Sequence, residues 1–192
     1  MDTDYSDSDF HGATWTDRHF DGCDFSESDF RGATLDRCTF TDCDFTRADL
    51  GEAVVRGTAF RSCSFDRTTL TDSTFTGCSL IGSTFVDCRF RPIAIRDSDL
   101  TLVSLVGASL RGTDLSDLRL CEANLDDADL RETDLRRSDL TGARLRRTDL
   151  TDADLRGTRV DPDGWVQAKL RGARIELDAA VAFAAAHGLR IG

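Results

Sequence analysis

The dominant pattern of the chain is an apolar residue at every fifth position. From Tyr5 to Val160, all 32 positions of this series are apolar. Positions five apart spread around an α-helix, which turns about 100° per residue, and they fall on opposite faces of a long strand. The pattern therefore requires a third geometry, in which each unit of five residues turns a corner.

Each of these apolar residues is preceded, two positions earlier, by a small one. Of the 32 positions in this second series, 28 are Ala, Cys, Ser or Thr. The residue between them is usually polar. In each unit we therefore expect the small and the large side chain to point inward and the polar one between them to point outward, which is the alternation of a very short strand. Glycine often follows two positions after the large residue, as at Gly12 and Gly22, where a turn with positive φ favours it. A short strand followed by a corner, repeated, predicts a coil.

The spacing of similar residues favours four sides per coil. With 20 residues per coil, Cys23, Cys43 and Cys63 stack on one another. Stacked coils pair as parallel strands about 4.8 Å apart, so eight coils make a rod about 38 Å long. We therefore expect an all-β solenoid over residues 1–176, a quadrilateral parallel β-helix of about eight coils with the large side chains along its axis.

Residues 177–192 differ in character and are expected to form a capping and dimerisation segment. The Ala-rich run from Asp178 to Gly188 predicts a short α-helix, with Asp178 as its N-cap and Gly188 just past its end. The last coil of a solenoid exposes strand edges, so we expect this helix to cover that end. The predicted dimer-interface residues are Val181, Phe183, Ala184, Ala185 and Leu189.

Six of the seven cysteines occupy the small inward position, which indicates buried thiols that act as small apolar groups. A metal site or a disulfide is less favoured, because the spacings match no zinc pattern and a cytoplasmic chain is reduced. The seventh, Cys121, stands at a turn position.

Charge is unevenly distributed along the chain. The net charge is −11, and residues 1–50 alone hold 13 acidic residues against four Arg, a balance of −9. In a 20-residue coil the aspartates between the two inward positions form columns. An Asp there can accept a hydrogen bond from a nearby backbone N–H, and it can also contribute to a DNA-like negative surface. The predicted binding residues are Asp4, Asp24 and Asp44, then Asp9, Asp29 and Asp49, then Asp114, Asp134 and Asp154.

The sequence also argues against several classes of function. A net-negative rod is not expected to bind nucleic acid directly. No phosphate-binding Gly loop, zinc helix motif or nucleophile elbow is present in the sequence, so we expect neither an enzyme nor a cofactor or metal site. No stretch approaches 18 apolar residues, and the acidic N-terminus does not resemble a signal peptide, so we expect a cytoplasmic protein without a membrane span.

The chain resembles the pentapeptide repeat family over at least residues 3–160. The likeness is carried by the strict period and by units such as Ala48-Asp49-Leu50 and Ala128-Asp129-Leu130. It implies a right-handed, four-sided parallel β-helix. Residues 60–92, 160–165 and 180–189 further resemble the members of this family that confer fluoroquinolone resistance.

This second likeness implies a function and partners. It implies a homodimer joined at the C-terminal ends that binds DNA gyrase, inhibits supercoiling and protects gyrase from fluoroquinolones by mimicking a DNA segment. We expect the mimicked segment to be the transported one, contacting the ATPase region of the gyrase B subunit. The alternative is a rod without gyrase activity that serves as a scaffold or binds another partner, since fold alone does not fix function.

Overall fold

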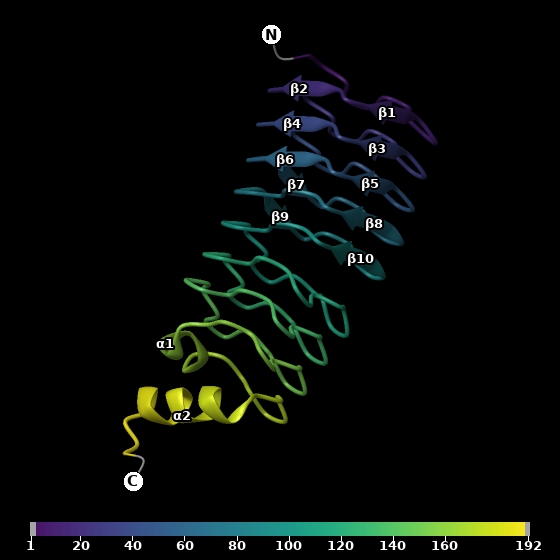
Figure 1. Ribbon diagram of the computed structural model, residues 1–192. Coiled ribbons are helices and arrows are strands. Elements are labelled where there is room, and N and C mark those ends of the chain that lie inside the picture. Colours follow the sequence, from purple (N-terminus) through teal and green to yellow (C-terminus); the bar gives the residue numbers. More distant parts are fainter. Residues whose placement is uncertain (1–2, 191–192) are drawn as a thin grey trace.

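The computed structural model describes residues 3–190 as a rod with the chain termini at opposite ends (Figure 1). It is a parallel β-solenoid built from strands of three or four residues, as the period predicts. The strands are β1 (Thr14–Thr16), β2 (His19–Asp21), β3 (Thr34–Asp36), β4 (Thr39–Thr41), β5 (Val54–Arg56), β6 (Ala59–Arg61), β7 (Ser64–Asp66), β8 (Ser73–Thr76), β9 (Thr84–Val86) and β10 (Ile93–Arg96).

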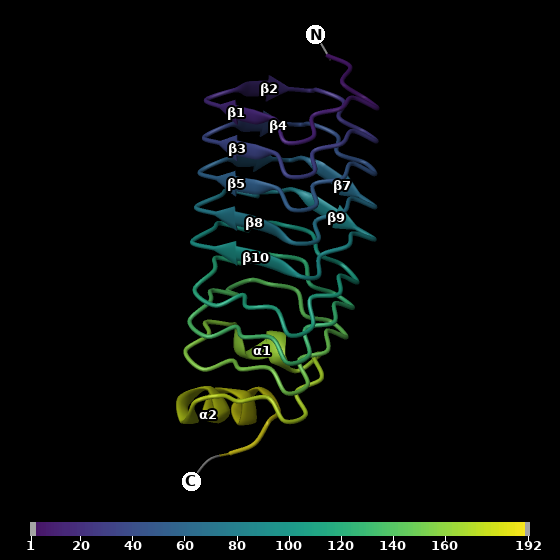
Figure 2. The same ribbon diagram turned by 90° about the vertical axis from the view of Figure 1, so that its right-hand side faces the viewer.

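Every pairing in the ladder joins residues 20 positions apart. Strands β1, β3, β5, β8 and β10 stack into one sheet, β2, β4 and β6 into a second, and β7 and β9 into a third (Figure 2). Isolated bridges extend the same register, so that one column runs from Asp4 at 20-residue steps to Arg144. The rod thus has four faces, which we name after their first paired residues: the Asp4, Asp9, Thr14 and His19 faces.

Corners between faces share one backbone conformation. Each corner consists of the two residues that follow a large inward residue. The second of them has a positive φ in every unit from Asp7 to Gly157 except at Pro92, whose ring fixes φ in the negative range. Ten of these corner positions are Gly, as the sequence predicts, but the other 20 are not. A left-handed conformation costs a non-Gly residue about 1–2 kcal/mol. The regular stacking of the coils therefore imposes this conformation even where the local sequence does not favour it.

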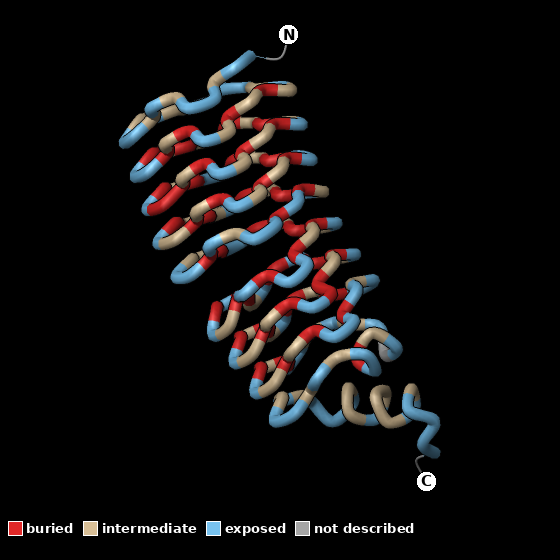
Figure 3. Tube along the Cα trace, turned by 180° about the vertical axis from the view of Figure 1, so that it is seen from behind, coloured by how far each residue is buried: buried red, intermediate tan, exposed pale blue. Residues whose placement is uncertain are grey.

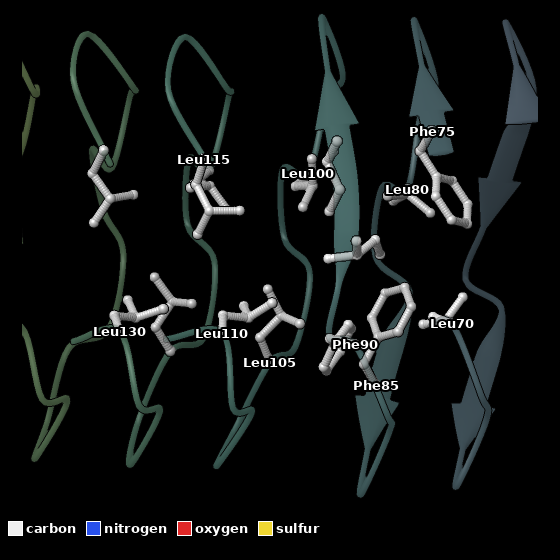
Figure 4. A pocket seen from close by; sticks show the side chains of 15 residues that line it. Leu70, Phe75, Leu80, Phe85, Phe90, Leu100, Leu105, Leu110, Leu115 and Leu130 are labelled. Atoms are coloured by element: carbon white, nitrogen blue, oxygen red, sulfur yellow. The ribbon is translucent and has the colours of Figure 1, made fainter. Parts of the chain in front are cut away.

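The large residues at the fifth positions are buried from Phe25 to Leu155, and along the trace in Figure 3 these buried positions alternate with corners that are mostly exposed. Phe25, Phe45 and Phe65 are fully buried, and their rings stack in a column with centroids 5.1 Å and 5.0 Å apart. Leu125, in the second half of the rod, is also buried. Figure 4 shows the side chains along the axis where Phe75, Phe85 and Phe90 give way to Leu100, Leu110 and Leu130.

Small inward residues with a hydroxyl group donate to backbone carbonyls, either in their own coil, as Ser28 does, or in the coil before. The hydroxyl groups of Thr68 and Thr148 each donate a 2.8 Å hydrogen bond to a backbone carbonyl, that of Phe45 or Leu125. Five of the six inward cysteines are buried and Cys88 is half-buried, which confirms their interpretation as small packing groups. Burial raises the pKa of the Cys88 thiol to about 11, so it stays protonated at neutral pH.

The C-terminal end carries two helices, α1 (Pro162–Trp165) and α2 (Leu177–Ala186). The second confirms the predicted helix, although Glu176 and not Asp178 is its N-cap; Asp178 lies in the first turn and makes no capping hydrogen bond. Gly188 has a φ of 77°, and the N–H groups of Gly188 and Leu189 donate to the carbonyls of Ala185 and Ala184, which closes the helix end as predicted. Neither helix has the length or the apolar run needed to cross a bilayer, as far as residues 3–190 are concerned.

Candidate functional site

The predicted aspartate columns are present on the surface of the rod. Asp4, Asp24 and Asp44 are bridged in succession on the Asp4 face, and Asp9, Asp29 and Asp49 on the neighbouring Asp9 face. The third column, Asp114–Asp134–Asp154, lies on the Thr14 face toward the C-terminal end. The three columns therefore do not form one continuous surface: two share the N-terminal end of the rod, and the third stands apart.

All nine aspartates have the structural role expected of an Asx turn. In each, the Oδ1 atom accepts a hydrogen bond from the backbone N–H two residues later, at 2.8–3.2 Å. Oδ2 is not used in this bond. The turn bond therefore leaves the second carboxylate oxygen of each of these nine aspartates free for another contact.

Arginine pairing separates the nine aspartates into two groups. Asp29, Asp134 and Asp154 each form an ion pair with an Arg two residues later, at 2.5–2.6 Å. The side-chain hydrogen bonds of Arg31 and Arg156 lower the pKa of Asp29 and Asp154 to about 2. Within residues 3–190, no cation pairs with the other six, which are Asp4, Asp9, Asp24, Asp44, Asp49 and Asp114.

Five of these six unpaired carboxylates belong to the two N-terminal columns. The third column keeps one unpaired carboxylate, Asp114, since Arg136 and Arg156 neutralise the other two. The net negative charge of residues 1–50 is therefore displayed mainly on two adjacent faces of the first coils.

Sequence reasoning missed the ion pairs between successive coils. Arg37, Arg137 and Arg147 each contact a carboxylate 20 residues earlier, that of Asp17, Asp117 or Asp127. Arg144 and Arg146 both bind Asp126, whose side chain is only 5% exposed. Of the 16 ion pairs among residues 3–190, 11 lie between residues 99 and 169. An Arg 20 positions after an Asp is the sequence signal that would have found four of these five pairs between coils, while Arg144 stands 18 positions after Asp126.

The predicted dimer-interface residues divide between two sides of α2. Val181 and Ala185 are exposed, as is Leu189 beyond the helix. Phe183 packs against the core of the rod instead, with its ring 4.2 Å from that of His187. Leu177, which sequence reasoning did not single out, is the most exposed large apolar residue among those described. Ala184 is half-buried.

Comparison with known proteins identifies the repeat. Residues 13–83 match the family profile described as a pentapeptide repeat region, and residues 123–160 match the profile described as pentapeptide repeats (8 copies). A stretch of 45 residues is 53% identical to the pentapeptide repeat protein MfpA of Mycobacterium tuberculosis. That stretch covers 23% of this chain and 25% of MfpA, so the match spans a quarter of that relative.

Solved structures support the same fold. QnrB1, described as a plasmid-mediated fluoroquinolone resistance protein, superposes with a TM-score of 0.82 over 93% of this chain and 91% of its own, at 20% identity. A trypsin-treated form of a QnrB1 variant superposes with a TM-score of 0.69 over 100% of this chain and 99% of that one, also at 20% identity. Together with the unbroken five-residue period and the 20-residue ladder, these matches show that the chain belongs to the pentapeptide repeat family and resembles MfpA.

Proposed function

We propose that this protein binds DNA gyrase as a mimic of DNA, inhibits supercoiling and protects gyrase from fluoroquinolones. The observation that carries the proposal is the set of five unpaired carboxylates in the two columns at the N-terminal end of the rod, where only Asp29 is paired with an Arg. The likeness to MfpA and the fold shared with a fluoroquinolone resistance protein support it.

The charge spacing of the first coils is comparable to that of a DNA duplex. Residues 1–50 carry a balance of −9 over about 2.5 coils, which is about 12 Å of rod at the parallel-strand spacing. The density is therefore about one negative charge per 1.3 Å, against about one per 1.7 Å in duplex DNA. A protein channel that attracts DNA through Lys and Arg would attract this surface for the same reason.

We further propose that the mimicked segment is the transported one, and that the rod contacts the ATPase region of the gyrase B subunit. A two-fold symmetric dimer of rods could align with the two-fold axis of gyrase. Titration of the isolated ATPase fragment with the full-length protein tests this docking. Saturable binding at moderate salt supports it, and no binding rules it out.

The proposed dimer forms through the C-terminal ends. The exposed apolar side chains of Leu177, Val181 and Leu189 lie on or beside α2, which leaves the N-terminal acidic columns of both rods free. With Phe183 packed on its own core, these three residues, with Ala185, are the proposed contacts. The two acidic ends would then lie at opposite ends of one long rod.

A supercoiling assay separates this function from a scaffold role. Purified gyrase is given relaxed DNA and ATP with increasing amounts of the protein. Inhibition that reaches completion at a stoichiometric excess supports the proposed function. Full supercoiling at every concentration, with the protein shown to be folded, leaves the scaffold as the better account.

A further inference from the structure

We propose that the middle of the Asp4 face is a second contact site for the same partner, one that recognises an apolar protein surface next to cationic side chains. The site is the mid-rod apolar patch, which we define as Ile81, Val86, Leu102 and Val106. Their relative exposures range from 37% to 52%. This inference rests on the proposed function and states what the partner must offer beyond positive charge.

The patch is assembled at the two edges of one face. Val86 and Val106 are 20 residues apart and stand at the corner after the Asp4 face, in successive coils. Ile81 and Leu102 belong to the corner before it. Between the edges lie Thr84 and Ser104, which are bridged to each other and carry no charge, so the area between the two edges is also uncharged.

Leu102 is an exception among the corners. Among the residues that the structure describes, 20 non-Gly residues have a positive φ at this position of the repeat. Nineteen of them are Asp, Glu, Arg or Ser, and the remaining one is Leu102, with a φ of 60°. Its side chain is 52% exposed, so packing in the rod does not explain it. A strained backbone and an exposed apolar side chain both disfavour leucine here, and such an outlier points to a contact made outside the fold.

Charge on the same face indicates what covers the patch. The column that contains Thr84 and Ser104 begins with Asp4, Asp24 and Asp44, and none of these three carboxylates has a cation partner within residues 3–190. A partner that covers the length of this face must place cationic groups over the first coils and an apolar surface over the middle ones. DNA cannot do this because it is a polyanion, and an anionic membrane would be repelled by the acidic end.

The patch would change how binding depends on salt. Contacts to the aspartates weaken as salt is added, because exposed charges are screened beyond about 8 Å at physiological ionic strength. Apolar burial is not screened in this way. A surface with both parts would hold a protein partner at salt concentrations that remove a ligand bound by charge alone, and it would distinguish that partner from other cationic proteins.

The test measures binding of full-length variants to intact gyrase at low and high salt. Leu102→Gly and Val106→Ser remove patch side chains without altering charge. The control for Leu102→Gly is Ser62→Gly, at a residue with a left-handed backbone (φ 52°) in the same corner two coils earlier. The control for Val106→Ser is Val166→Ser, because Val166 is 43% exposed and Val106 is 42% exposed. We expect Leu102→Gly to keep or raise the Tm, because the backbone strain is relieved, and yet to weaken binding about tenfold at both salt concentrations.

Each outcome is decisive. Weaker binding by both patch variants, with both controls binding like the wild type, supports the site. Patch variants that bind gyrase as tightly as the wild type overturn it while leaving the proposed function intact. If the patch variants instead change only the sedimentation coefficient of the free protein, the patch is a contact between copies of this chain and the proposal is wrong. Wild-type protein that does not bind gyrase at all overturns the proposed function, and this inference with it.

Discussion

At the scale of single residues, the repeat assigns each position one physical task. The fifth position fills the axis, as at Phe45, which is fully buried between the rings of Phe25 and Phe65. The outward position caps the following turn, as Asp24 does for Ser26. The same aspartate can thus serve the fold through Oδ1 and a partner through Oδ2, and these roles need not compete.

Replacing Phe45 with Ala should destabilise the rod by about 3–5 kcal/mol, since it removes a fully buried ring and leaves a cavity on the axis. Val86→Ala, at an exposed corner, is the control and should change the free energy of unfolding by less than about 0.5 kcal/mol. Denaturant unfolding measures both. A midpoint for Phe45→Ala that barely moves would mean that the ring does not contribute to an axial core.

Acid should weaken the rod in a defined pH range. Because Arg31 and Arg156 lower the pKa of Asp29 and Asp154 to about 2, their stabilising contribution is complete above the ordinary value of about 3.9 and is lost as pH falls toward 2. The Tm should therefore fall between pH 4 and 2. Asp29→Asn with Asp154→Asn, which keeps a side-chain oxygen for each turn, should reduce that fall. An identical pH dependence in the double variant would contradict this assignment.

At the scale of the repeat element, the sequence predicted the architecture well and the surface poorly. Large apolar residues at every fifth position, each with a small residue two positions before it, are accommodated by a coil of short strands and corners. The coil, the 20-residue ladder and the axial core could therefore be predicted from this pattern. The ion pairs were missed because the period of five does not show them. They depend on an Arg that stands two or 20 positions after a given Asp, as Arg31 and Arg37 do, and the 20-residue neighbours are apparent only once the coil length is known. The left-handed corners at non-Gly residues were missed because stacking, and not local preference, imposes them.

The C-terminal elements show the same division. The Ala-rich run predicted α2, but not which of its sides faces the rod. Phe183 anchors the helix because a large ring can cover the last axial residues, a fact of tertiary packing that the helical pattern does not contain. Helix α1 was not predicted either. It replaces one side of a coil and contains the buried Trp165, which stands five residues after Val160 and so continues the five-residue period.

Adding a methyl group at a glycine corner should measure the cost of the left-handed conformation directly. Gly112 has a φ of 68°, and a Cβ built there meets no atom within 4 Å. Gly112→Ala should therefore lower the free energy of unfolding by about 1 kcal/mol through backbone strain alone. Chemical denaturation provides the value. A variant as stable as the wild type would show that this corner tolerates the conformation without strain.

At the scale of the whole molecule, the rod is asymmetric along its length. Unpaired carboxylates dominate the first coils, ion-pair ladders dominate the later ones, and exposed apolar residues gather in the middle of the Asp4 face and at α2. This division is consistent with the proposal that the N-terminal end and the Asp4 face bind a partner, while the C-terminal end forms the contact between two copies of the chain.

Val181→Asp should weaken the proposed dimer, because it places a charge on the exposed side of α2. Val166→Asp is the matched control, since both valines are 43% exposed and Val166 lies outside that helix. Sedimentation velocity across a concentration series reports the monomer–dimer equilibrium. We expect the first variant to shift toward monomer and the control to behave like the wild type. Equal sedimentation of all three would reject an interface on α2.

The central claim, that unpaired acidic columns act as DNA-like charge toward gyrase, is tested most directly by removing charge while keeping the fold. Asp4, Asp24 and Asp44 are replaced together by Asn, which retains the hydrogen bond to each turn, and Asp134→Asn with Asp154→Asn is the control at carboxylates that Arg already neutralises. The concentration that half-inhibits supercoiling should rise about tenfold or more for the triple variant and much less for the control. Unchanged inhibition by a folded triple variant would contradict the account.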